Sequence, residues 1–339
     1  MHLWSIYGAL VTIAVIWSKV NAQIITKDTV TNGPVSITDK IINVKRGYYW
    51  SIFNWESPDF LYPINVQGQF YIYFGLPNKT LRIRQVNGPF YNFGLVYFKA
   101  SLASALFDLR PQSFNNLGDL YFISDRSPSV SFSIWCNPWT NYLGGSIYMY
   151  SDARQPNSVI FGNSPPQIVN DGQICLRNNR WKATSVIIGS GCIDIGVNSN
   201  FQYNLYKQPF NPKQTLYLST PTSTLSLGGQ GQTEKYLVAG FGGGNMISLT
   251  FPITKFAYGT NTGVLTLTAT SYIINITIGK GYDKSLFEIT QADLGPGVGL
   301  SPLNGVITYN GAVPVGSTSH GVCTICKDEP EYPPPPPAT

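Results

Sequence analysis

Hydrophobic residues recur along the first two thirds of the chain in a short phrase of glycine, any residue, apolar residue, tyrosine, apolar residue. Gly68-Gln-Phe-Tyr-Ile and Gly118-Asp-Leu-Tyr-Phe are clear copies. The spacing between six successive copies is 26, 24, 27, 27 and 19 residues. A repeat period in the twenties is typical of a solenoid. An early copy starts at Gly33, and the six glycines are Gly68, Gly94, Gly118, Gly145, Gly172 and Gly191.

The second and fourth residues after each glycine are apolar. Strand side chains alternate between faces, so we expect these residues to point inward and stack coil on coil. An asparagine often stands two residues before the glycine, and we expect this pair to form a corner with positive φ. We predict a right-handed parallel β-helix over residues 23–208. The alternative, a sandwich of hairpins, needs strands at 8–12-residue spacing. The inward residues are Phe70, Ile72, Val96, Phe98, Leu120, Phe122, Ile147, Met149, Ile174 and Leu176.

The pattern changes after about residue 209. Short segments rich in β-branched residues follow, with a hairpin turn at Asn261-Thr-Gly263. They predict a smaller antiparallel β-sandwich over residues 209–326, with strands at 215–219, 223–227, 236–239, 247–251, 264–268 and 273–278. Residues 327–339 contain the run Pro333–Pro337, which favours polyproline II and reads as the start of a stalk. The expected class is all-β.

Residues 1–22 have the character of a secretory signal peptide, with an apolar centre and a Val-Asn-Ala cleavage site. The remaining chain is expected to be secreted. Charged residues are only 12% of the sequence and the net charge is +5. So weak and scattered a charge gives no support for a nucleic-acid partner.

Five cysteines in a secreted chain favour disulfides. Cys175 and Cys192 point outward from neighbouring coils, but their expected Cα separation of roughly 8 Å exceeds the reach of a disulfide. We therefore expect each of them to bond one of Cys323 and Cys326, which leaves Cys136 unpaired. A local Cys175–Cys192 bridge remains the alternative. One histidine in the mature chain gives little support for zinc at Cys323-x-x-Cys326.

Several phrases of the second half resemble the N-terminal domain of hyphally regulated cell wall proteins, which are adhesin-like fungal surface glycoproteins. The resemblance covers residues 23–326 and is most specific from Asn170 onward. It implies a β-helix followed by a β-sandwich, displayed on the cell wall by a Ser/Thr-rich stalk with a GPI anchor, and roles in adhesion, biofilm formation and virulence. The phrases are Asn170-Asp-Gly-Gln-Ile-Cys-Leu176, Gly189-Ser-Gly-Cys-Ile193, Thr215-Leu-Tyr-Leu-Ser219, Gly240-Phe-Gly-Gly-Gly-Asn245, Thr262-Gly-Val-Leu-Thr-Leu267, Gly279–Ile289 and Asn304–Val315.

Parallel β-helices also house polysaccharide-cleaving enzymes, which need two carboxylates facing one groove. Asp119 and Asp194 are outward, but they are expected several coils apart, beyond the roughly 5–10 Å that such a pair requires. We identify no catalytic residue, metal ligand or cofactor site. The run Gly242–Gly244 lacks the Lys-Ser/Thr of a phosphate loop and is expected to be a turn or a bulge in a strand.

The third residue of the phrase places Tyr71, Tyr97, Tyr121 and Tyr148 in an outward column. Such rings stabilise a sheet by packing alone, and the sandwich or a loop could cover them; left exposed, they would be a contact surface for sugars or apolar material. Sequons at Asn78 and Asn275 predict N-glycosylation.

The sequence therefore predicts a secreted, cell-wall-displayed adhesin-like head. Its ligand is unknown and could be a host surface, a glycan or an abiotic surface, and it would join wall glucan through a C-terminal anchor. A wall-modifying polysaccharide enzyme and a nonspecific structural coat protein are the alternatives.

Overall fold

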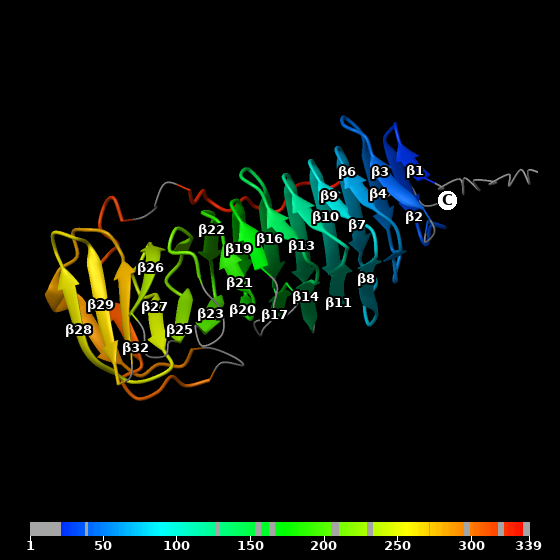
Figure 1. Cartoon of the computed structure of the whole chain (residues 1–339). Helices are drawn as coiled ribbons and strands as arrows, with labels where there is room; N and C mark the ends of the chain where they lie inside the picture. The colour runs from blue at the N-terminus through cyan, green and yellow to red at the C-terminus, as the bar shows by residue number, and fades with distance from the viewer. Residues whose placement is uncertain are drawn as a thin grey trace, which may run out of the picture.

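The structure is a computed structural model that describes residues 22–37, 40–126, 129–152, 157–162, 167–204, 210–228, 233–270, 272–294, 299–317 and 322–334. The predicted signal peptide, apart from Ala22, and the end of the proline run lie outside these residues. Within them the regular structure is β, apart from the 3-10 turn η1 (Lys284–Leu286). Across the described ranges, no helix is long and apolar enough to cross a membrane. The strands form an elongated stack (Figure 1).

One wall of the stack is a sheet of eight short strands, in which every neighbouring pair is parallel. Each strand comes from a different turn of the chain. In spatial order they are β1 (Ala22–Ile25), β3 (Ile41–Val44), β6 (Ile64–Val66), β9 (Phe90–Asn92), β12 (Phe114–Asn116), β15 (Trp139–Asn141), β18 (Gln167–Asn170) and β21 (Val186–Ile188).

The second wall is a thirteen-stranded sheet that contains the strands of the glycine phrase. It is parallel from β2 to β30, and its last three strands pair antiparallel. In spatial order they are β2 (Thr29–Asn32), β4 (Tyr49–Phe53), β7 (Gln69–Phe74), β10 (Leu95–Ser101), β13 (Asp119–Asp125), β16 (Ser146–Ser151), β19 (Gln173–Arg177), β22 (Cys192–Ile195), β24 (Thr215–Leu218), β26 (Thr233–Ala239), β30 (Ile273–Thr277), β29 (Val264–Ala269) and β28 (Ile253–Gly259).

The third wall is an eleven-stranded sheet, which is parallel from β5 to β27 and antiparallel at its far end. In spatial order its strands are β31 (Phe287–Thr290), β32 (Val306–Tyr309), β27 (Met246–Leu249), β25 (Thr224–Gly228), β23 (Asn200–Asn204), β20 (Asn179–Ala183), β17 (Asn157–Phe161), β14 (Val130–Ile134), β11 (Ser104–Arg110), β8 (Thr80–Val86) and β5 (Asp59–Phe60).

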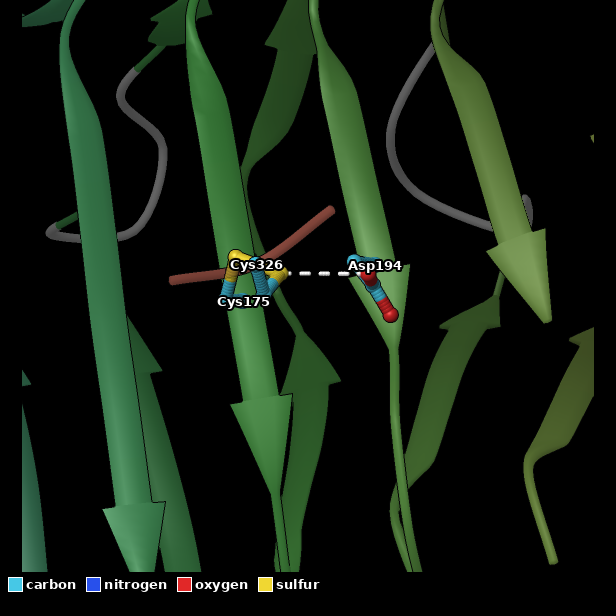
Figure 2. Close-up of side chains that lie close together, drawn as sticks. All are labelled: Cys175, Asp194 and Cys326. Carbon is cyan, nitrogen blue, oxygen red and sulfur yellow. Dashed lines mark hydrogen bonds between the residues drawn. A yellow bond between two sulfur atoms is a disulfide. The ribbon is translucent and has the colours of Figure 1, made fainter. Parts of the chain in front are cut away.

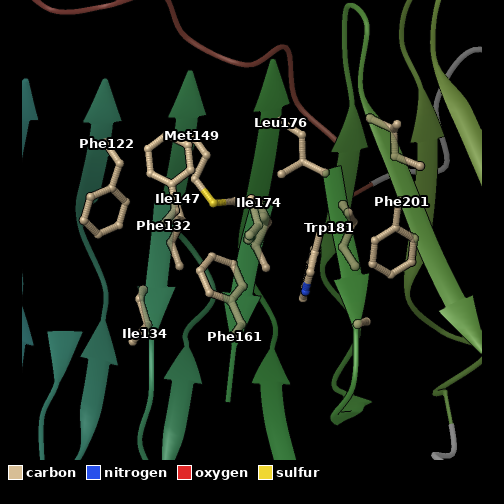
Figure 3. Packing of buried hydrophobic residues seen from close by; sticks show 14 of the residues in the cluster. Phe122, Phe132, Ile134, Ile147, Met149, Phe161, Ile174, Leu176, Trp181 and Phe201 are labelled. Atoms are coloured by element: carbon tan, nitrogen blue, oxygen red, sulfur yellow. The ribbon is translucent and has the colours of Figure 1, made fainter. Parts of the chain in front are cut away.

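The space between the walls is filled by the side chains that the phrase predicted to point inward. Phe98 and Phe122 occupy the same register on successive coils, while Phe70 lies opposite Val96 on the coil before them, and all three have no exposed surface. Their ring centroids are 5.9 Å apart from each neighbour to the next. The same stacking continues along the core (Figure 3). The predicted parallel β-solenoid is confirmed: inward and outward side chains alternate along each strand, and the same alternation repeats on the parallel strand of the next coil.

A buried row of asparagines holds one corner of the solenoid. The amide nitrogen of Asn92 donates to Asn116, Asn116 to Asn141, and Asn141 to Asn170, each at 2.8 Å. All four side chains are completely buried. Each amide thus satisfies its neighbour, which lets polar side chains stack inside the corner without unpaired groups.

The expected reason for glycine at this corner was wrong. The six glycines from Gly68 to Gly191 that begin the phrase do not have positive φ; only the early copy, Gly33, does, with φ of 82°. A Cβ built on Gly94 would lie 2.0 Å from the carbonyl oxygen of Gly68, and one on Gly118 would lie 2.0 Å from that of Gly94. Glycine is needed there because successive coils approach too closely for any side chain.

The strands expected after residue 209 are present, and some are antiparallel: β28 with β29, β29 with β30, β27 with β32, and β31 with β32. They extend the solenoid sheets, because β24 pairs parallel to β22 and β25 pairs parallel to β23. Leu216 and Leu225 remain fully buried and continue the core stack across residue 209. Antiparallel pairing is therefore confined to the far end of these sheets.

Candidate functional site

Four tyrosines form a column on the outer face of the thirteen-stranded sheet. Register aligns Tyr71, Tyr97, Tyr121 and Tyr148 on the neighbouring strands β7, β10, β13 and β16. Ring centroids are 5.8, 6.2 and 4.1 Å apart along the column, and the last pair is stacked. This is the outward column that the phrase predicted, because its third residue alternates with the two buried ones.

The column does not end with tyrosine. The next two positions in register are Cys175 on β19 and Asp194 on β22. Both are buried, although they face away from the solenoid interior. Something must therefore cover this outer face.

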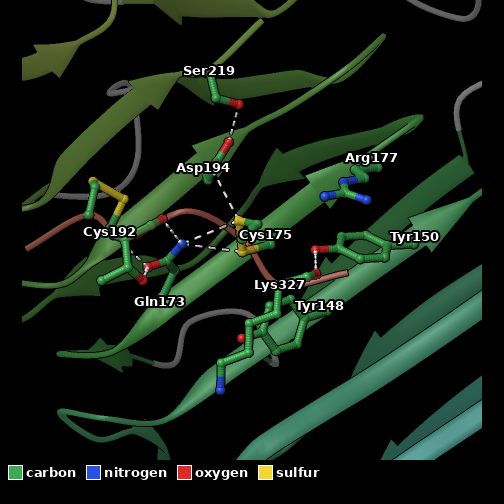
Figure 4. The surroundings of a disulfide bond; sticks show 12 residues. Tyr148, Tyr150, Gln173, Cys175, Arg177, Cys192, Asp194, Ser219 and Lys327 are labelled. Carbon is green, nitrogen blue, oxygen red and sulfur yellow. Dashed lines mark hydrogen bonds between the residues drawn. A yellow bond between two sulfur atoms is a disulfide. The ribbon is translucent and has the colours of Figure 1, made fainter. Parts of the chain in front are cut away.

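The cover is the C-terminal segment 322–334, here named the C-terminal strap. Disulfides join Cys192 to Cys323 and Cys175 to Cys326, with Cα atoms 5.2 and 6.1 Å apart (Figure 4). The bridges thus run from coil to strap, as the sequence favoured, and there is no local Cys175–Cys192 bond. Cys136 is free and buried, and burial raises the pKa of its thiol to about 12.

Gln173 pairs with the strap between the two bridges. Its Nε2 donates to the carbonyl of Thr324 at 2.6 Å, and its Oε1 accepts from the Thr324 backbone N–H at 3.0 Å. This is the two-bond pattern by which a neighbouring strand would hold an extended chain. The side-chain amide therefore fixes the strap where the sheet backbone cannot reach it.

Beyond the bridges the strap is held by polar contacts. Tyr150 donates to the Lys327 carbonyl at 2.7 Å, and Lys327 Nζ bonds Asp119 at 2.8 Å. Glu329 accepts from both Lys99 and Tyr97. These contacts occur on successively earlier coils, so the strap crosses the strands.

Tyr332 completes the cover. Its ring stacks on Tyr73 at 4.9 Å and lies 5.9 Å from Tyr97. Residues up to Tyr332, which the sequence assigned to the start of a stalk, are thus packed against the solenoid. Short-range patterns could not reveal this, because Lys327–Tyr332 has no periodicity that matches the column.

The tyrosine column is therefore not the exposed contact surface that was considered from the sequence. Tyr71, Tyr97, Tyr121 and Tyr148 are at most 3% exposed. Burial raises the pKa of Tyr71 to about 12, and it raises the pKa values of Tyr97 and Tyr121 further. The rings serve as the packing face for the strap, which is the structural role that the sequence also allowed.

Asp194 lies beside the Cys175–Cys326 disulfide. It accepts a hydrogen bond from Ser219 Oγ at 2.5 Å (Figure 4). Its other oxygen is 3.1 Å from the sulfur of Cys326 (Figure 2). A disulfide sulfur carries no hydrogen, so this second contact is a hydrogen bond only when Asp194 is protonated and donates. Burial raises the pKa of Asp194 to about 6, against the opposing effects of Ser219 and Arg177.

Cys175, Asp194 and Cys326 place three possible metal-ligand atoms within 4.8 Å of one another. The two sulfurs are joined in a disulfide, however, and so offer no thiolate for a metal. The other outward acid, Asp119, lies on β13, three strand spacings or roughly 14 Å from Asp194. That separation exceeds what a pair of glycosidase carboxylates uses.

A groove opens where the strap passes the first five coils. Its volume is about 720 Å³, which is in the range of ligand sites. Tyr48 is 40% exposed there. Aromatic rings, amides and a carboxylate–lysine pair therefore face one space. The lining side chains include Tyr48, Tyr49, Gln67, Gln69, Asp119 and Lys327.

The two sequons differ in setting. Asn78 is exposed in a turn with φ of 61°. Asn275 is half-buried in β30, between β26 and β29, and accepts a hydrogen bond from Thr266 at 2.8 Å. Glycosylation at both remains a prediction.

The fold is an all-β parallel solenoid whose C-terminal strap is joined to its outer face by two disulfides. Such disulfides are typical of proteins in an oxidising, extracytoplasmic compartment. The family described as hyphally regulated cell wall protein N-terminal matches residues 13–333, so the chain belongs to this family. Its members are cell wall proteins, and this chain is directed to the cell wall or cell surface.

Three of the relatives, all from Candida albicans, show the extent of the similarity. Cell wall protein IFF3 is 31% identical over 336 residues, which are 96% of this chain and 35% of the relative. Hyphally regulated cell wall protein 4 is 30% identical over 318 residues, 90% of this chain and 25% of the relative. Hyphally regulated cell wall protein 1 is 30% identical over 254 residues, 72% of this chain and 26% of the relative. The chain thus spans about a quarter to a third of these relatives' length.

Proposed function

We propose that this chain is the adhesin-like head of a longer fungal cell wall glycoprotein, which attaches the cell to surfaces or to a host and contributes to biofilm formation. In this proposal a stalk follows the strap and joins wall glucan through a GPI-derived anchor. The antiparallel end would act as a small sandwich-like cap, and glycans on Asn78 and Asn275 would cover part of the surface.

The observation that supports attachment is the groove beside the strap. Tyrosine rings can stack on the apolar faces of sugars, while amides and carboxylates bond their hydroxyls. Gln69 Oε1 already accepts from Tyr71 at 2.7 Å, so its amide is held in place before a ligand arrives. The strap wall of the groove follows the disulfide at Cys326. It is held there by Tyr150 and Asp119, which both bond Lys327, and this lowers the entropy lost on binding. A hydroxyl-rich ligand such as a glycan fits this lining best.

The test is binding of the glycosylated mature chain to a glycan panel, host matrix proteins and bare hydrophobic plastic. Two tyrosines of equal exposure give a matched pair: Tyr48, 40% exposed, lines the groove, and Tyr62, 41% exposed, does not. Saturable glycan binding should weaken about 10-fold, or ~1.4 kcal/mol, in Tyr48→Ser and remain unchanged in Tyr62→Ser.

The competing functions give different results in the same experiment. Binding to plastic alone, insensitive to Tyr48→Ser, would indicate a nonspecific coat and contradict the proposal. Release of soluble sugars from β-glucan would indicate a wall-modifying enzyme.

A further inference from the structure

The strap runs against the direction in which the solenoid grows. Cys323 meets the coil of β22, Cys326 meets β19, Glu329 meets β10, and Tyr332 meets Tyr73 at the end of β7. The red segment in Figure 1 passes along the stack in this direction. A segment that follows the strap therefore starts near the first coils, far from the antiparallel end.

The two disulfides are nested. Cys175–Cys326 spans 151 residues, and Cys192–Cys323 spans 131 residues inside it. The outer bridge closes residues 176–325 into a covalent loop. A pull on the chain after Cys326 is passed through the bridge to Cys175 and does not enter this loop when the opposing hold lies before Cys175.

The groove satisfies that condition. Its solenoid lining runs from Asp28 to Tyr121, before Cys175 in the chain, and its other wall is the strap itself. A load between a groove ligand and the C-terminal side would act on early coils and the strap. The antiparallel end, residues 253–317, would lie outside the load path.

We propose that the strap and its outer disulfide are a force-bearing clasp, which transfers tension from the C-terminal side of the chain into the solenoid at β19 and shields residues 176–325 from unfolding. The physiological value of this clasp rests on the proposed stalked attachment, but the covalent loop acts whatever the ligand. Under tension, the noncovalent contacts of the strap beyond Cys326 break first, because the force can separate each pair of groups one after another.

Single-molecule pulling of the mature chain between an N-terminal and a C-terminal handle tests the clasp. Under oxidising conditions, the chain should stop extending with residues 176–325 still locked. Reduction should release about 50 nm more contour length, at roughly 3.5 Å for each of the locked residues. Release of that length without reduction would overturn the proposal, and so would no increase on reduction.

Variants of the two bridges provide a matched control. Without the outer bridge, in Cys175→Ser/Cys326→Ser, the inner bridge still locks its own span, which is 151 − 131 = 20 residues shorter. This variant should gain about 7 nm. Cys192→Ser/Cys323→Ser should gain nothing, because its bridge lies inside the outer one. Equal gains in both variants would contradict the nested clasp.

If a variant does not fold, reduction of the unmodified chain still decides the outcome. The pulling experiment uses no ligand. A chain that binds no glycan would therefore disprove the attachment site, and the contour lengths measured by pulling would stay the same. Conversely, contour lengths that contradict the prediction would disprove the clasp and would not bear on the proposed glycan binding.

Discussion

The ring of Tyr332 stacks on that of Tyr73, with centroids 4.9 Å apart and planes 18° from parallel. One residue lies near the end of the described chain and the other on the third coil strand of the thirteen-stranded sheet. Their contact shows how far the strap reaches beyond its last disulfide, and it makes the strap after Cys326 the first target for testing.

Tyr332→Ala should loosen the strap beyond Cys326. The stacked ring contributes about 1–2 kcal/mol to docking, from its buried area and its aromatic pairing. Hydrogen exchange of residues 327–334 should rise about 10-fold, while exchange of the core strands stays constant. Tyr62→Ala is the control, since Tyr62 does not touch the strap. Unchanged exchange in Tyr332→Ala would mean that the bridges alone hold the segment.

Stability should fall as pH rises through about 6, because of Asp194. Its folded pKa is raised above the ordinary value of 3.8 for an aspartate, mainly by burial. Its contribution is therefore complete below about pH 4 and is lost as the buried carboxyl ionises. A shift of this size corresponds to roughly 2–3 kcal/mol. Among its neighbours, Arg177 opposes the shift, and Ser219 does so as a hydrogen-bond donor.

Asp194→Asn imitates the protonated acid, since an amide can donate toward Cys326 and accept from Ser219. Denaturant unfolding between pH 4 and pH 7 should show this variant to be more stable at pH 7 and less dependent on pH. Asp152→Asn, at an exposed position, is the control. A parent protein with constant stability across this range would refute the role of Asp194.

Asn141→Leu should be strongly destabilising. Asn141 is fully buried, accepts from Asn116 and donates to Asn170. The substitution leaves one amide hydrogen of Asn116 and the Oδ1 of Asn170 without their partner, which costs about 1–3 kcal/mol for each. We expect a loss of roughly 3 kcal/mol or more in the free energy of unfolding. Asn115→Leu, on the outward side of the adjacent strand, should cost less than about 1 kcal/mol; equal losses would refute the ladder's importance.

The adjacent residues Gly144 and Gly145 distinguish two reasons for glycine, which are a positive φ and the close approach of a neighbouring coil. A Cβ on Gly145 would lie 2.5 Å from the Asn116 carbonyl oxygen, whereas Gly144 has φ of +87° and open space around it. Gly144→Ala should cost about 1 kcal/mol from strain alone. Gly145→Ala must push two coils apart and should cost about 3 kcal/mol or more in thermal or denaturant unfolding. The reverse order would restore the explanation from positive φ.

Much of the solenoid could be predicted because its signals are local. Phe70 and Ile72 are inward since alternation within one strand sets their face, and the repeat period shows that strands stack. The coil-to-strap disulfides followed from the register of Cys175 and Cys192. The positions of the strands after residue 209 were also predicted correctly. Their pairing direction was predicted correctly only at the far end of the sheets, because no local pattern shows whether two strands pair parallel or antiparallel. Leu216 and Leu225 have the same alternation in a parallel or an antiparallel sheet, and only the path of the connecting chain decides between them.

Local patterns in the sequence specify the all-β class, the inward stack and the outward column from Tyr71 to Tyr148. The burial of this column is visible only in the folded chain, because its cover is a segment remote in the sequence. The residues of that segment, from Lys327 to Tyr332, carry no repeating pattern. The tertiary structure also decided the reason for glycine at the corners. That reason is the distance between one coil and the next, a quantity that no single coil specifies.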